Sequence, residues 1–256
     1  MTQTFSIIRS LHNGLKIPAI GSAPSFLCAP ELGYRLFDLS LDDSERKAFA
    51  DSLSSSGVPR YDCAWILHVP AEVHTYDETE RWIRQSLKKL SASYADIVLL
   101  DSSDKGYNTQ CWRALEDLYK AGTIFAMGTG CGTSAHLDRL LSESTISPML
   151  TETVLYPGHP QKDMVRYAGE HNIDLLAVIP EDALSVLASK EIDILARKYS
   201  VSPLVLCLRY QADKKAIPIV PECALTPTQL AEALDFELSE QDALYLDSMK
   251  DYGKTD

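Results

Sequence analysis

The stretch TERWIRQSLKKLSASYADIVLLDS, residues 79–102, predicts a helix that leads directly into a buried strand. Thr79, Ile83, Leu87 and Leu90 recur at helical spacing among charged residues, so they form one apolar face. The apolar run at the end of the stretch is short and has the length of a strand. A helix followed by a buried strand is the repeating unit of parallel α/β folds.

Eight short apolar runs of this kind recur along the chain. They cover residues 19–23, 34–40, 62–69, 97–102, 124–130, 149–156, 174–180 and 217–222. Segments with helical spacing lie between them, and strands that alternate with helices require crossover connections and a parallel sheet. The chain has 256 residues, of which 45% are hydrophobic, enough for one substantial core. The sequence therefore predicts a (β/α)8 TIM barrel that spans residues 1–256 as a single domain.

The amino-acid composition restricts the cellular location and the kinds of partner that we expect. The net charge of −12 disfavours nucleic acid, because a phosphate-binding surface needs clustered Lys and Arg. The N-terminus has no apolar signal segment, and no run approaches the roughly 20 apolar residues of a membrane span. The 6 cysteines lack C-x-x-C spacing, which predicts reduced thiols in a cytoplasmic protein. We expect a small-molecule substrate, no membrane partner and no nucleic acid.

Ionisable side chains stand at the ends of three neighbouring predicted strands. Asp38, His68 and Asp101 end successive apolar runs, and Asp43 follows Asp38 in the next loop. Each of the first three shares its strand face with an apolar residue two positions earlier. In a barrel the chemistry lies at the carboxyl ends of the strands, so we expect these groups to meet at the barrel mouth.

Seven segments, in order, resemble motifs of the aldo-keto reductase family. They are LHNGLKIPAIG at 11–21, GYRLFD at 33–38, SLKKL at 86–90, YADIVLL at 94–100, WRALEDL at 112–118, AGTI at 121–124 and FELS at 236–239. The resemblance implies the same barrel. It also implies an active site with shorter loops, since the loop after Asp101 and the C-terminal tail are shorter than those typical of the family.

The resemblance places the family's catalytic Asp, Tyr, Lys and His at Asp38, Asp43, His68 and Asp101, so only the Asp is retained. The family's contacts to NADPH are replaced as well. Glu222 and Gln229 stand where cations usually bind the 2′-phosphate. The carboxamide and ring contacts correspond to Gly130, Cys131, Thr151, Glu152 and Val178. We therefore expect no nicotinamide cofactor.

Clustered carboxylates beside a histidine provide an acid and a base together, because at least one carboxyl is pushed to keep its proton. The sequence favours a cofactor-independent lyase, isomerase or cyclase that acts on a small organic intermediate, of the kind used in biosynthesis. His68 is the expected base or proton shuttle, Asp101 or Asp43 the acid, and Asp38 the residue that orients His68. The same barrel-mouth argument predicts that Cys131, Glu152 and Tyr156 line the substrate pocket.

Three alternatives remain open. The barrel could be a non-catalytic binding or scaffold protein, with Asp43 serving only to start a helix. Asp38, Asp43, His68 and Asp101 could instead hold a divalent metal, although no ligand spacing supports this, and we expect none. The third alternative is a residual NAD(P)H-dependent carbonyl reductase.

Overall fold

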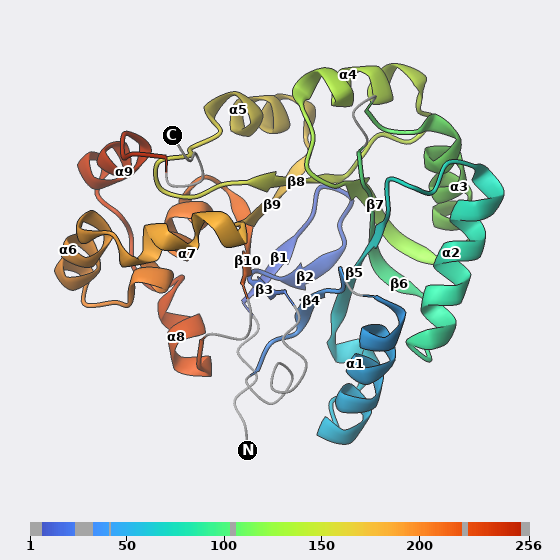
Figure 1. Ribbon diagram of the computed structural model, residues 1–256, viewed down its shortest axis with the longest axis horizontal. Coiled ribbons are helices and arrows are strands. Elements are labelled where there is room, and N and C mark those ends of the chain that lie inside the picture. The colour runs from blue at the N-terminus through green and yellow to red at the C-terminus, as the bar shows by residue number, and fades with distance from the viewer. Residues whose placement is uncertain (1–6, 24–32, 41, 103–105, 222–224, 252–256) are drawn as a thin grey trace.

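Eight parallel strands close into a barrel in the computed structural model, which describes residues 7–23, 33–40, 42–102, 106–221 and 225–251 (Figure 1). The order of the strands around the barrel is β10-β3-β4-β5-β6-β7-β8-β9. Their bounds are β3 Gly21–Ser22, β4 Leu36–Asp38, β5 Ala64–Val69, β6 Ala95–Leu100, β7 Ile124–Thr129, β8 Leu150–Val154, β9 Asp174–Val178 and β10 Ala216–Val220. Each of the eight predicted runs overlaps one barrel strand, and the closed barrel of parallel strands confirms the predicted (β/α)8 fold.

Helices form a ring outside the barrel (Figure 1). They are α1 Asp43–Ser56, α2 Tyr76–Lys89, α3 Thr109–Lys120, α4 Ser134–Glu143, α5 Lys162–His171, α6 Lys190–Tyr199, α7 Pro203–Asp213, α8 Pro227–Glu232 and α9 Glu240–Asp247, with 3₁₀ segments at Arg60–Asp62 and Glu181–Ala188. Within the described residues, no helix is both long and apolar enough to cross a membrane.

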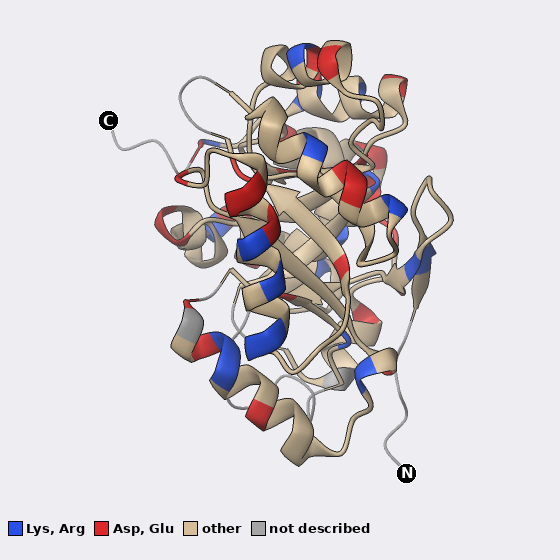
Figure 2. Ribbon diagram, turned by 90° about the vertical axis from the view of Figure 1, so that its right-hand side faces the viewer, with Lys and Arg blue, Asp and Glu red and all other residues tan. Residues whose placement is uncertain are grey.

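Helix α2 shows why these segments are helical. Thr75 caps its first turn and forms a capping box with Glu78, while Ile83 and Leu87 are buried against the barrel. Acidic residues occupy the first turn and basic residues the last, which complements the helix dipole and is visible on the flank shown in Figure 2. The apolar face predicted from the sequence is the face that packs.

Side chains fill the inside of the barrel. Leu36, Ile66, Ile97 and Leu99 belong to one buried cluster with residues of the other strands. Alternate residues point outward, and Trp65 accordingly packs edge-on against Phe49 of α1. The barrel is therefore a packed core, and reactions are confined to its rim.

A β-hairpin covers the amino-terminal end of the barrel. Its strands are β1 Ile8–Ser10 and β2 Lys16–Pro18, and Leu11 and Ile17 pack into the barrel interior. Asp174, the first residue of β9, accepts hydrogen bonds from the Arg9 guanidinium at 3.1 Å and the His12 backbone N–H at 2.8 Å. The opposite end, where the strands finish, is left for the functional site.

Candidate active site

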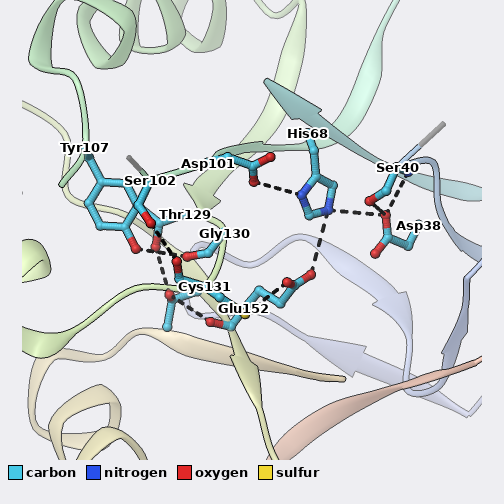
Figure 3. A network of polar contacts seen from close by, with 11 residues as sticks. Asp38, Ser40, His68, Asp101, Ser102, Tyr107, Thr129, Gly130, Cys131 and Glu152 are labelled. Carbon is cyan, nitrogen blue, oxygen red and sulfur yellow. Dashed lines mark hydrogen bonds and ion pairs between the residues drawn. The ribbon is translucent and has the colours of Figure 1, made fainter. Parts of the chain in front are cut away.

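Three adjacent strands bring Asp38, His68 and Asp101 together at the carboxyl end of the barrel (Figure 3). Asp38 is the last residue of β4, His68 lies in β5, and Asp101 directly follows β6. The strand register pairs Asp38 with Ile66 and His68 with Leu99, so the three side chains share the inward face. This juxtaposition is the one predicted from the sequence.

The imidazole of His68 lies between two carboxylates. Its Nδ1 is 3.1 Å from Oδ1 of Asp101, and its Nε2 is 3.2 Å from Oδ1 of Asp38. The Nε2 atom is buried, and the direction of its N–H satisfies no hydrogen bond to any described residue. The contact with Asp38 is therefore an ion pair between the imidazole and the carboxylate.

Burial by itself would lower the pKa of His68, because it penalises the charged ring. The charge of Asp38 and the hydrogen bond with Asp101 outweigh that effect and hold the pKa well above its usual value. Burial would likewise raise the pKa of Asp38, but the charge of His68 and the hydrogen bonds from the backbone N–H and hydroxyl of Ser40 keep it lowered. At neutral pH the pair is therefore an imidazolium and a carboxylate.

Glu152 and Cys131 extend the cluster along the rim. Glu152 lies in β8, with Oε2 3.8 Å from Nε2 of His68, and the Cys131 thiol donates to Oε1 at 3.1 Å. Burial raises the pKa of Glu152, while His68 opposes that rise and the Asp38 and Asp101 charges add to it. Burial and the Glu152 charge raise the pKa of the Cys131 thiol. Cys131 is consequently a neutral thiol at physiological pH.

Two predicted site residues, Asp43 and Tyr156, are not among the described members of this cluster. Asp43 begins α1, whose N-cap is Asp42 in a capping box with Glu45, and the side chain of Asp43 lies outside the described structure. Tyr156 follows β8 and is buried, and its hydroxyl donates to Asp251 at 2.6 Å. The structure therefore gives the Tyr156 hydroxyl an internal partner instead of an open pocket wall.

Sequence reasoning missed three residues that hold this cluster in place. The Ser40 hydroxyl donates to Asp38 at 2.8 Å, the Ser102 hydroxyl donates to the carbonyl of Cys131 at 2.8 Å, and the buried Tyr107 hydroxyl donates to the carbonyl of Gly130 at 2.9 Å. Ser40 could have been found, since a serine two residues after an aspartate commonly closes a local turn. Nothing local in the sequence indicates the Tyr107 contact, which spans two loops.

A cation could also bridge part of the cluster. Ligand atoms of Asp38, His68 and Glu152 lie within 4.8 Å of one another, and no other such group occurs in the described parts of the chain. The positively charged imidazole already lies between these carboxylates, and it neutralises them as a cation would. Of the two other residues in the predicted metal set, Asp101 is not in this group, and the side chain of Asp43 lies outside the described residues.

The comparison with known families decides the assignment. The model of the Aldo/keto reductase family matches residues 28–251. The chain belongs to the aldo/keto reductase family.

Curated relatives of this aldo/keto reductase carry reductase names. It is 28% identical over 253 residues to "Glyoxal reductase" of Bacillus subtilis, which covers 93% of this chain and 91% of that protein. It is 26% identical over 213 residues to "Methylglyoxal reductase DkgA" of Escherichia coli O157:H7, with 81% of this chain and 75% of that protein covered.

Solved structures share the fold. An aldo-keto reductase named MGS-M4, from a deep-sea metagenome library, superposes with a TM-score of 0.85 at 22% identity and covers 96% of both chains. A Gox0644 mutant in complex with NADPH gives 0.83 at 23% identity, with 98% of this chain and 96% of that chain covered.

These findings correct the functional prediction. A nicotinamide-independent lyase, isomerase or cyclase is wrong for this chain, because the chain belongs to the aldo/keto reductase family and its relatives carry the names of glyoxal and methylglyoxal reductases. The physical reason for the error is that protonatable side chains do not separate these reaction classes. Hydride addition to a carbonyl also needs a proton donor, for the oxygen that becomes an alkoxide. The family is instead one whose enzymes act on small carbonyl substrates.

Proposed function

We propose that this aldo/keto reductase is a nicotinamide-dependent reductase of small carbonyl compounds, and that His68 supplies the proton. The observation that carries the proposal is the Nε2 atom of His68. It is buried at the rim, it belongs to a ring that two carboxylates keep protonated, and its N–H satisfies no hydrogen bond to a described residue.

The proton transfer follows from this geometry. A substrate carbonyl oxygen that meets Nε2 accepts its proton while the carbonyl carbon gains hydride, and the product is an alcohol. Asp101 holds the ring through Nδ1, and Asp38 stabilises its charge from the other side. Between turnovers the imidazole regains its proton from solvent, since the partly exposed side chain of Asp101 lies beside it.

The same proposal explains why the family's residues could be exchanged. The positions that resemble the family's Tyr, Lys and His are Asp43, His68 and Asp101 in this chain. A phenol donates a proton at neutral pH only with help from neighbouring cations, because its usual pKa is about 10. An imidazolium donates without that help, so a histidine at the Lys position can take over the role of the phenol.

The rim residues fit the amide end of a nicotinamide. A carboxylate oxygen can accept from an amide N–H group, and Oε2 of Glu152 lies 3.8 Å from His68, beyond hydrogen-bond distance. Glu152 stands where the resemblance places a residue that contacts the dinucleotide. When bound, the reduced cofactor would supply hydride. Acidic neighbours favour this step, because a nicotinamide becomes positively charged as hydride leaves.

The phosphate end of the cofactor meets a different setting. Glu222, one of the two residues that replace the family's cations, lies outside the described residues. The other, Gln229, is engaged locally, since its Oε1 accepts from the Thr226 backbone N–H at 3.0 Å in the first turn of α8. We therefore propose weaker preference for NADPH over NADH than a cationic pocket would give.

The substrates proposed are small aldehydes and dicarbonyls, in line with the names of the glyoxal and methylglyoxal reductases among its relatives. The test is oxidation of NADPH and of NADH by purified protein in the presence of glyoxal and methylglyoxal, followed by absorbance, with the alcohol product identified by NMR. Folded protein that oxidises neither cofactor with either aldehyde would contradict the proposal.

A further inference from the structure

Among the described residues of the barrel rim, negative charge exceeds positive charge. Asp38, Asp101 and Glu152 surround one cation, His68, within 3.8 Å of its ring nitrogens (Figure 3). In the described parts of the chain, no lysine or arginine forms an ion pair with any of these three carboxylates. The single imidazolium is thus shared among three acids.

We infer that this rim selects carbonyl substrates by charge, so that neutral and cationic aldehydes are reduced while aldehydes that bear a carboxylate are excluded, with Glu152 and Asp101 as the residues that impose the selection. The inference rests on the proposed function and deepens it, because it names the class of substrate that the same site accepts.

Among the described residues of this rim, a substrate carboxylate has no acceptable partner. Anionic substrates are usually held by an arginine or lysine that offers several donors. Here the one described cation already has a carboxylate on each ring nitrogen, at 3.1 and 3.2 Å. A further carboxylate would be placed beside like charges in partly buried surroundings, where their repulsion is strong.

The two selecting residues differ in exposure. Asp101 has 37% of its side chain exposed, so its charge acts on a substrate as it enters. Glu152 has 14% exposed and lies deeper, so its charge acts on a substrate that has reached His68. Asp101 also positions the His68 ring, whereas Glu152 lies beyond hydrogen-bond distance from it. Glu152 is therefore the better residue with which to test selection by charge.

The experiment compares three small aldehydes that differ mainly in charge: glyoxylate, glyoxal and betaine aldehyde. At low ionic strength, kcat/KM for glyoxal and betaine aldehyde should exceed that for glyoxylate by about tenfold or more, as like-charge repulsion requires. The Glu152→Gln variant keeps the shape of the side chain. It should lower the ratio of kcat/KM for glyoxal to kcat/KM for glyoxylate by roughly threefold or more. Added salt should narrow the ratio for the parent as well.

Glu143→Gln is the matched control. It removes one negative charge from an exposed position on α4, where Glu143 pairs with Arg139, and should leave the ratio unchanged. A parent protein that reduces glyoxylate as well as glyoxal would overturn the inference. An unchanged ratio in folded Glu152→Gln would overturn it too.

A binding measurement separates this inference from the proposed function. Saturation-transfer NMR with acetamide and acetate reports binding without turnover. If no aldehyde is reduced but acetamide binds and acetate does not, the proposed reduction fails while selection by charge is supported. If acetate binds as well as acetamide, selection by charge fails, whatever the reductase assay gives.

Discussion

His68 and Asp101 stand on adjacent strands, and Nδ1 of the histidine lies 3.1 Å from Oδ1 of the aspartate. Because β5 and β6 are neighbours in register, this pair is built by the barrel itself, without a contribution from a long loop. The contact leaves Nε2 on the side of Asp38 and Glu152, 3.2 and 3.8 Å from their carboxylate oxygens. It also contributes to the raised pKa of His68, together with the larger effect of the Asp38 charge.

Replacing His68 with glutamine should abolish proton donation with little change in shape. We expect kcat for glyoxal reduction to fall roughly 100- to 10,000-fold, the usual range for removal of a general acid, with a smaller change in KM. Steady-state kinetics and circular dichroism check the outcome. His74→Gln, at an exposed histidine before α2, is the control and should behave like the parent. Activity retained in folded His68→Gln would assign the proton to another group.

The Asp101→Asn variant tests the pH dependence. The protonated form of His68 is the active form, so activity should be present below the raised pKa and lost as the pH rises through it. The hydrogen bond with Asp101 is one of the causes that raise this pKa, so its weakening should move the alkaline limb of the kcat profile to lower pH. If the alkaline limb of the kcat profile lies at the same pH in the variant and in the parent, His68 does not control that limb.

The Gly130→Ala variant should displace the side chain of Asp101, although residue 101 itself is unchanged. A Cβ atom at residue 130 would overlap Oδ1 of Asp101, so the carboxylate has to turn away from His68. We expect kcat to fall about tenfold, with the same acid shift of the alkaline limb as in Asp101→Asn. Gly169→Ala is the control, because a Cβ there meets no atom within 4 Å and lies in helix α5. Equal kinetics for the two variants would refute the role of Gly130.

The Asp38→Asn variant should reduce stability only over a limited range of pH. The pKa of Asp38 is lowered, so its stabilising effect is lost as the pH falls through that pKa. The pKa of His68 is raised, so its effect is lost as the pH rises through it. Between these limits we expect the free energy of unfolding to fall by about 1–3 kcal/mol. Urea unfolding of parent and variant should show the difference shrinking as the pH is raised from about 6 to about 10. A constant difference would contradict the ion pair.

Asp174→Asn should loosen the hairpin at the other end of the barrel. Asp174 is buried and accepts from Arg9 and from two nitrogen atoms of His12, and removal of its charge weakens all three contacts. We expect a loss of about 1–3 kcal/mol in the free energy of unfolding and faster hydrogen exchange in the hairpin. Because the hairpin lies at the end of the barrel opposite His68, kcat should be unchanged. A large loss of kcat would mean that the two ends are coupled.

The fold could be predicted because its determinants are local and repeated. In the apolar runs around Leu36, Ile66 and Leu99, residues that face into the barrel alternate with residues that face outward. Each run is followed by a helix with one apolar face. The hairpin motif was also recognisable. The contacts of Asp174 with Arg9 and His12 were not, because they join residues more than 160 positions apart in the sequence.

The site could be predicted in part. Strand parity and the barrel-mouth rule were enough to bring Asp38, His68 and Asp101 together, since neighbouring parallel strands end at one rim. The same rule predicted that Tyr156 lines the pocket. Its hydroxyl instead donates to Asp251, because the path of the chain after β8 is set by tertiary contacts. The reaction class could not be derived from the residues alone, because acid, base and imidazole serve both proton transfer and hydride transfer.

The hairpin that covers the amino-terminal end also restricts access to the barrel. With that end closed and the interior filled by side chains such as Ile66 and Leu99, two reactants have to arrive through one opening. In the proposed reaction the carbonyl compound and the nicotinamide would therefore enter and leave from the same face, and they would lie side by side against the residues of one rim.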